Sequence, residues 1–118
     1  DKAEKLLEAS WQTYRQLSQK NRKYIENELR AWLHWSTAAA KTGAWEEIVA
    51  TVDRYYEMVD YLAIDERVLE YLWIKKHAPL PPDPESLLPR IPYPTIRQRF
   101  EETLNYIAER YNDLHENL

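Results

Sequence analysis

The sequence predicts an all-α fold, an antiparallel bundle of three to four helices in one domain that covers residues 1–118. Three observations lead to this prediction. The chain contains a single glycine, Gly43, and its seven prolines all lie between residues 79 and 94, so the rest of it holds no helix breaker. Apolar residues outside the Pro-rich segment recur about every 3.6 positions, the period of an amphipathic helix. Five Trp and nine Tyr add large flat side chains that fill a core, line a pocket or form an interface.

The first helix is expected over residues 2–41, since this stretch contains neither proline nor glycine. Its apolar side chains fall on one face at helical spacing. This face collects Leu7, Trp11, Tyr14, Ile25, Leu29, Trp32, Ser36 and Ala39, with Trp35 on a flanking stripe. Polar residues interrupt the face at 18–22, where Ser and Asn compete for backbone hydrogen bonds. A kink or break there is the alternative to one continuous helix.

The next segment is expected to hold one or two helices. Gly43 ends the first helix, because glycine is the usual left-handed residue beyond a helix C-terminus. A second helix then covers residues 44–62. The apolar face changes direction after it, and Asp65 suits the N-cap of a third helix over 66–77. A continuous helix over 44–77 that changes its buried face is the alternative.

Residues 78–94 form a Pro-rich connector that cannot be one regular helix, because proline lacks the backbone N–H, although residues 83–88 have a cap and leave room for one short helical turn. Short proline runs with a nearby Arg, here Arg90, can dock on aromatic grooves as polyproline II ligands. We favour a stiff crossover that fixes the angle between the helices on either side. The last helix is expected over 95–115, opened by a capping box of Thr95 and Gln98.

Composition argues against several classes of function. The formal net charge of -4 and the pI near 5.4 are unlike a general nucleic-acid binder, which needs clustered Lys and Arg. The lack of cysteine removes disulfides, thiolate nucleophiles and Cys-ligated metal sites. No apolar run approaches the roughly 20 residues that cross a bilayer. We therefore expect no nucleic acid or membrane partner and a soluble protein, cytoplasmic if it is natural.

Polar and small residues lie among the aromatics of the first helix and could line a ligand cavity. The pocket candidates are Trp11, Tyr14, Ser18, Asn21, Glu28, Trp32, Trp35 and Ser36. The alternative is that these polar and small residues mark a kink or a close helix crossing. The sequence does not decide between a pocket and a packed core.

The residues that usually carry catalysis or bind metals are not arranged for either. Helical metal sites place a second ligand three or four residues away, but an Ala, an Ile and an Asn precede His34, His77 and His115 by three. No serine lies in a Gly-x-Ser-x-Gly turn, and one glycine cannot build a phosphate-binding loop. We predict no catalytic residue, no metal and no cofactor. A haem with one axial histidine is the alternative left open.

Trp32, Trp35, Gly43 and Trp45 are placed like the bulky residues and the turn of a tetratricopeptide repeat, so residues 31–56 resemble one such repeat. An Ile and a Tyr stand where that family has two alanines. The resemblance implies a helical hairpin of the kind used for protein binding. The whole chain also resembles computationally designed helical-bundle proteins in its lack of Cys, single Met, capped helices and Pro-punctuated connector.

The leading functional hypothesis is a non-enzymatic helical scaffold or protein-interaction module, natural or designed. The chain is rich in signals that specify a fold and lacks recognisable chemistry. Since the last helix is too short to cover the long first helix, the aromatic face predicts a homodimer or a protein partner. The alternative is a small-molecule or haem-like cofactor binder with an aromatic-lined pocket, natural or engineered for catalysis.

Overall fold

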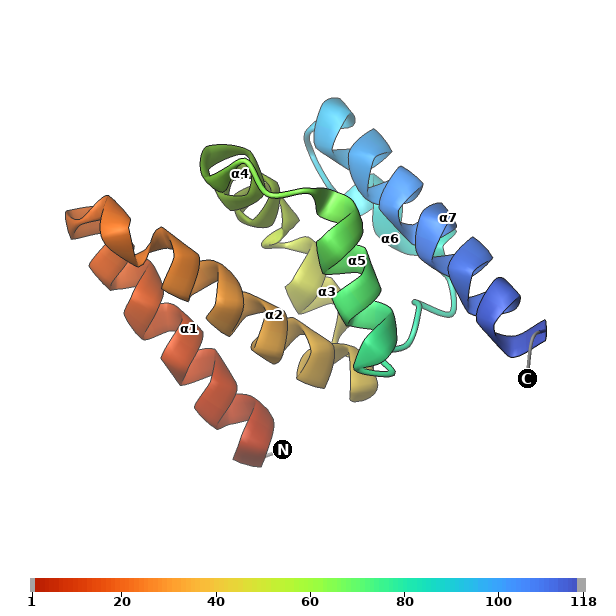
Figure 1. Cartoon of the computed structure of the whole chain (residues 1–118), viewed down its shortest axis with the longest axis horizontal. Coiled ribbons are helices and arrows are strands. Elements are labelled where there is room, and N and C mark those ends of the chain that lie inside the picture. Colours follow the sequence, from red (N-terminus) through yellow and green to blue (C-terminus); the bar gives the residue numbers. More distant parts are fainter. Residues whose placement is uncertain (1, 117–118) are drawn as a thin grey trace.

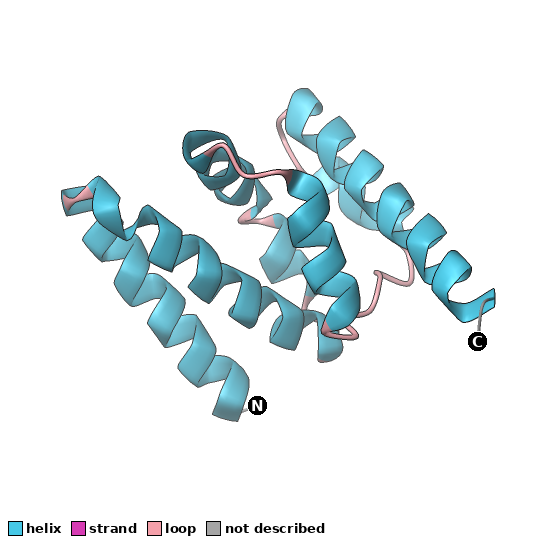
Figure 2. Ribbon diagram, in the orientation of Figure 1, coloured by secondary structure: helices cyan, strands magenta, loops and turns pink. Residues whose placement is uncertain are grey.

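The computed structural model describes residues 2–116, with side chains described for residues 2–113, and every regular element in this range is helical (Figures 1 and 2). The all-α prediction is confirmed. The elements are α1 (Lys2–Lys20), η1 (Arg22–Tyr24), α2 (Ile25–Lys41), α3 (Trp45–Val49), α4 (Val52–Leu62), α5 (Glu66–Lys75), α6 (Pro84–Leu87), η2 (Leu88–Arg90) and α7 (Pro94–Glu116). The described range thus has more helices than the three to four predicted.

The helices pack side by side around α2, α4 and α5. One face of α2 packs on α1, with which it forms an antiparallel hairpin, and other residues of α2 contact α3 and α4. On the far side, α7 packs on α4 and α5, while η2 and α6 lie behind it (Figure 1). The principal extents are 45 × 33 × 26 Å.

The predicted continuous helix over residues 2–41 is wrong, and the alternative of a break at 18–22 holds. The N–H of Asn21 makes the last bond of α1, to the Leu17 carbonyl at 2.9 Å, and Asn21 itself is extended. Its side chain accepts a hydrogen bond from the Lys23 N–H at 3.1 Å and so caps η1. The chain reverses at this point, and α1 folds back along α2.

This reversal changes the surroundings of the aromatic stripe. The ring of Trp11 on α1 stacks on that of Trp35 on α2, with centroids 5.0 Å apart, and both residues are nearly inaccessible. The stripe is therefore covered within one chain. The reason for expecting a homodimer disappears, and the oligomeric state stays a prediction.

Residues 44–77 form three helices, so neither the single helix over 44–62 nor the continuous alternative is correct. The first break lies at Thr51, whose hydroxyl donates to the Ile48 carbonyl and accepts from Trp32 Nε1, both at 2.8 Å. The second break follows α4, where Ala63 adopts a left-handed φ of 53°. Asp65 caps α5 as predicted, by accepting from the Arg67 N–H at 3.0 Å.

The remaining boundaries differ from the predictions by one or two residues. The third helix, expected to reach residue 77, ends at Lys75, and His77 has a left-handed φ of 57°. The last helix begins at Pro94 instead of 95 and runs to Glu116 instead of 115. The connector is pinned to the core by buried Leu87 and Ile91, as expected of a crossover.

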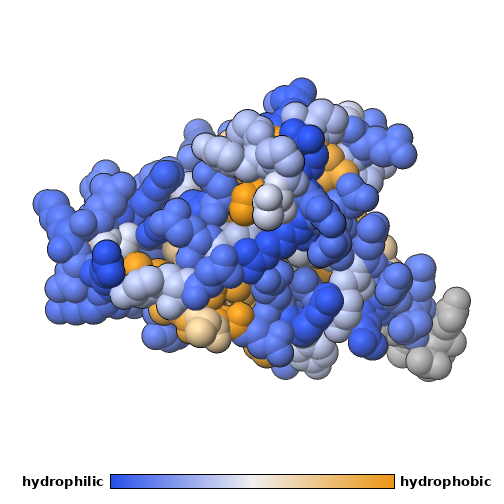
Figure 3. All heavy atoms as spheres, turned by 90° about the horizontal axis from the view of Figure 1, so that it is seen from above, coloured by the Kyte–Doolittle hydropathy of each residue, from blue (hydrophilic) through white to orange (hydrophobic). Residues whose placement is uncertain are grey.

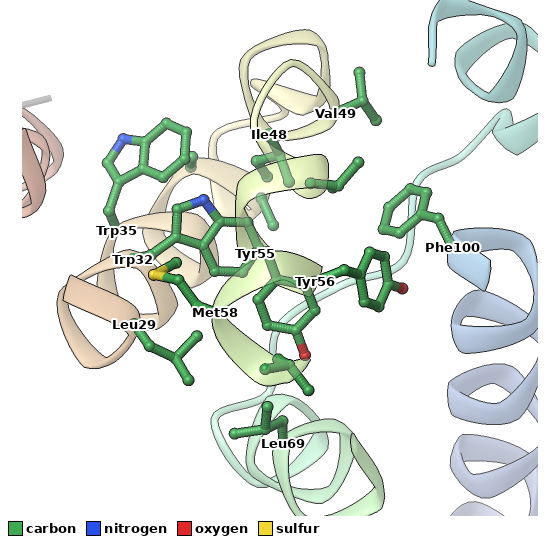
Figure 4. Packing of buried hydrophobic residues seen from close by; sticks show 14 of the residues in the cluster. Leu29, Trp32, Trp35, Ile48, Val49, Tyr55, Tyr56, Met58, Leu69 and Phe100 are labelled. Carbon is green, nitrogen blue, oxygen red and sulfur yellow. The ribbon is translucent and has the colours of Figure 1, made fainter. Parts of the chain in front are cut away.

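The centre of the core holds aromatic rings of α2 and α4 packed among aliphatic side chains (Figure 4). Trp32 stacks on Tyr55 with ring centroids 4.5 Å apart, and Tyr55 meets Tyr56 edge to face at 4.9 Å. Phe100 extends from α7 toward this group (Figure 4). The apolar void beside these rings measures about 40 Å³. The core is therefore filled by the protein's own side chains.

Candidate functional site

Three polar side chains from three helices meet inside the protein at the end where α1 turns into α2. We call Ser18 of α1, Glu28 of α2 and Arg54 of α4 the Glu28 cluster. Glu28 is 0% exposed, and Arg54 donates to its two carboxylate oxygens from Nε at 2.8 Å and from Nη2 at 2.7 Å. The Ser18 hydroxyl donates to Oε1 of the same carboxylate. A bidentate pair of this kind fixes the direction of the guanidinium.

Burial and ion pairing shift the pKa of Glu28 in opposite directions. Burial alone raises the pKa of the carboxyl, but hydrogen bonds from Arg54 and Ser18 together with the arginine charge outweigh it, and the pKa lies below its ordinary value. The hydrogen bonds to Glu28 raise the pKa of Arg54 in turn. Both groups are therefore charged at neutral pH.

This arrangement does not suit acid–base chemistry. A general base works best with a pKa near the operating pH, and Glu28 is held ionised well below it. Ser18 is only 5% exposed, and its hydroxyl already donates a hydrogen bond to Glu28. The cluster instead ties α1, α2 and α4 together and holds Arg54 in place.

An open groove of about 500 Å³ lies over the cluster, between the C-terminal end of α1 and α4. We call it the arginine groove. It is lined by Arg15, Ser18, Gln19, Arg22, Arg54 and Tyr61, with Glu57 as its one acidic lining residue. This end of the molecule, at the left of Figures 1 and 3, is covered mainly by hydrophilic residues.

The charges in the arginine groove are not balanced. Arg54 is paired with Glu28 and also with Glu57. Arg15 and Arg22 form no ion pair within the part of the chain whose side chains are described, although the charge of Arg15 adds to that of Arg54 in lowering the pKa of Glu28. Each lies over an aromatic ring instead, with the guanidinium carbon of Arg15 5.5 Å from the Trp11 ring centroid and that of Arg22 5.8 Å from the Tyr61 ring centroid.

The eight pocket candidates do not share one cavity. Ser18 and Glu28 meet in the cluster, Asn21 is an exposed cap, and the Ser36 hydroxyl donates to the Leu33 carbonyl at 3.2 Å. The aromatic candidates pack on rings or on the core: Trp11 on Trp35, Trp32 on Tyr55, and Tyr14, half-buried, against the core.

Sequence reasoning missed the arginines of the groove. Arg54 carries no signal of its own, because several basic residues could have paired with a buried Glu28. Arg15 and Arg22 do carry one. The stretch from residue 15 to residue 23 contains four basic residues and no acidic one, in a chain whose net charge is negative.

A second groove, of about 830 Å³, lies at the surface where α4 and α5 meet α7. Both arginines that line it are paired. Arg99 donates to Asp60 and Glu66, and Arg67 donates to Glu70 at 2.9 Å. The Arg99 pairs join α7 to α4 and α5, whereas Arg67 and Glu70 pair within α5. Neither arginine of this groove is without a carboxylate. The outer face of α5 exposes the side chains of Val68, Tyr71 and Leu72.

Within the described residues, no group of three His, Asp or Glu side chains could hold a metal ion. His34 is exposed, and its Nδ1 lies 2.9 Å from Lys76 Nζ, while the side chain of His115 lies outside the described residues. None of the described helices is both long enough and apolar enough to cross a bilayer.

No protein-family model matches the chain, and neither the curated proteins nor the solved structures searched include a match to it. The resemblances to a tetratricopeptide repeat and to designed helical bundles stay predictions.

Proposed function

We propose that this chain is a non-enzymatic protein-interaction module and that its partner contacts the arginine groove. The observation that carries the proposal is that Arg15 and Arg22 line an open groove without a carboxylate partner among the described residues, each supported by an aromatic ring. Arginine and tyrosine are the residues most enriched at the centres of protein interfaces. The groove presents both types.

Rigidity supports the same proposal. Binding is weakened when long side chains must be ordered at the interface. Arg54 is already held by a fully buried carboxylate, and Tyr61 lies under Arg22 while remaining 52% exposed. Much of the groove is therefore arranged before a partner arrives.

The aromatic-pocket alternative has one observation in its favour, the buried indole N–H groups of Trp11 and Trp35, which have no hydrogen-bond partner among the described residues. The space beside the core rings argues against it. Pockets for small molecules usually enclose about 300–1,000 Å³. The apolar void next to Trp32 and Tyr55 measures about 40 Å³, because these two rings stack on each other. A haem-like ligand would require the rings to separate.

A display experiment tests the proposal. The full chain is immobilised and exposed to a phage library of random dodecapeptides, in parallel with the double variant Arg15→Gln/Arg22→Gln. We expect a family of peptides that the wild-type chain retains and the variant does not. The matched control, Lys2→Gln/Lys5→Gln, removes the same charge from exposed positions at the other end of α1 and is expected to retain that family. If the wild-type chain and the groove variant retain the same peptides, the groove is not the interaction surface.

A further inference from the structure

We propose that the arginine groove binds an acidic segment of the partner protein, in which Asp or Glu carboxylates pair with Arg15 and Arg22. This inference rests on the proposed function and adds the chemistry of the partner. It follows from two observations: which arginines of the groove are paired with a carboxylate, and how charge is distributed along the chain.

The available donors belong to Arg15 and Arg22. Arg54 donates to Glu28 and to Glu57. Glu57, the one acidic residue that lines the groove, is therefore already paired with Arg54 and does not neutralise Arg15 or Arg22. The aromatic contacts of Arg15 and Arg22 involve the guanidinium faces and leave the N–H groups in the guanidinium plane for other partners. Two parallel N–H groups match the two oxygens of a carboxylate, which makes a bidentate pair the best use of each arginine.

The surrounding charge favours the same ligand. Lys20 and Lys23 belong to the same stretch 15–23, which has no acidic residue, and they add positive charge at the α1–α2 turn that forms this end of the molecule. A short acidic segment approaching this end meets a field of opposite sign. The chain as a whole has 20 acidic and 16 basic residues, so the excess negative charge lies elsewhere.

That distribution argues against long polyanions. A nucleic acid or an anionic bilayer extends beyond a single end of a molecule this size and would face the acidic remainder of the surface. A segment of a few acidic residues touches the basic end alone. The ring of Tyr61 adds apolar area that an aliphatic or aromatic neighbour of the carboxylates could cover.

Direct binding of fluorescein-labelled octaglutamate, followed by fluorescence anisotropy with the full chain, tests the inference. We expect wild-type binding that weakens as sodium chloride is added, because salt screens exposed charges. Arg15→Gln/Arg22→Gln should lose about tenfold or more in affinity, since each charge-assisted contact at an exposed site contributes a few-fold. Arg22→Gln alone, at an exposed position, should lose about threefold. Lys2→Gln/Lys5→Gln should stay within about twofold.

The result separates this inference from the proposed function. Equal affinity of the wild type and both groove variants for octaglutamate overturns the acidic partner. If the dodecapeptides that depend on Arg15 and Arg22 carry no excess of Asp and Glu, the acidic partner is also overturned, while the groove remains an interaction surface. If no groove-dependent peptide emerges, the interaction surface fails as well. Circular dichroism of each variant confirms that the helical fold is retained in these comparisons.

Discussion

Replacing Arg54 by methionine would leave the Glu28 carboxylate inside the protein without its cation. Methionine keeps much of the aliphatic volume of arginine but donates no hydrogen bond. Two charge-assisted bonds, of 2.7 and 2.8 Å, disappear from a carboxylate that is 0% exposed. The Ser18 hydroxyl remains as a donor but carries no charge.

The expected loss in the free energy of unfolding is about 3–5 kcal/mol, the usual cost of removing one partner of a buried ion pair. This range applies because the Glu28 carboxylate is fully buried, at 0% exposed. A domain of this size is typically stable by about 5–15 kcal/mol, so Arg54→Met would remove a large part of the total. The melting temperature should fall by about 15 °C.

The reverse substitution should cost less. In Glu28→Met the remaining arginine keeps Glu57, and its side chain is already 20% exposed, so it can reach water. We therefore expect Arg54→Met to be more destabilising than Glu28→Met. The double variant should be more stable than Arg54→Met, since it leaves no unpaired buried charge.

Urea unfolding followed by circular dichroism measures all three variants, at pH 7 and again at lower pH. In the wild type, the lowered pKa of Glu28 gives a stabilisation that is present above the ordinary carboxyl pKa and lost as the pH falls through the lowered value. Without Arg54, burial raises the pKa of Glu28. The difference in unfolding free energy between the wild type and Arg54→Met should therefore become smaller as the pH is lowered. A loss below about 1 kcal/mol for Arg54→Met, or one equal to that of Glu28→Met, would refute the reasoning.

Three further predictions concern other parts of the chain. Ala63→Gly should raise the unfolding free energy by about 0.5–1 kcal/mol, because the left-handed φ of 53° suits glycine; unchanged or lower stability in urea would contradict this. Thr51→Val should cost about 1–3 kcal/mol, since it leaves the buried N–H of Trp32 without an acceptor, whereas Thr13→Val on the exposed face of α1 should cost less in the same assay. Burial raises the pKa of Glu70, so wild-type stability should decline as the pH rises from the ordinary carboxyl pKa through that raised value, and Glu70→Gln should reduce this slope when thermal unfolding is followed across pH. An identical slope for both proteins would rule out Glu70 as its source.

Helix content and the placement of the breakers could be predicted from the sequence, because proline and glycine act locally. The single Gly43 does have a positive φ, of 81°, and the Pro-rich connector does separate α5 from α7. Two breaks without such a residue could also be predicted, one before the Asp65 cap and one, as an alternative, at 18–22, but the break at Thr51 could not. The break at Thr51 depends on a tertiary contact, since the Thr51 hydroxyl is held partly by Trp32, which is 19 positions earlier in the chain. The turn at Asn21 is instead capped locally, by the Lys23 N–H.

The sequence predicted two members of the candidate site but not the third. Ser18 and Glu28 stand out because they are polar on an apolar face, and the structure brings them together. Their partner could not be identified, because pairing Arg54 with Glu28 requires knowing that α4 crosses α2 at this height. The aromatic candidates illustrate a different limit. A stripe of rings has the same spacing whether it lines a pocket or packs on other rings.

The position of α1 at the margin of the fold has a dynamic consequence. This helix packs chiefly on α2, and its bond to α4 runs through Ser18 and Arg54. Because α1 packs chiefly on one neighbour and lies at the margin, it is a natural unit of local opening, and its backbone amides should exchange with deuterium before those of α2 and α4. Because the arginine groove has one wall on α1 and the other on α4, an occupant would bridge them and slow that exchange, so ligand occupancy could be read from the protection of α1 alone.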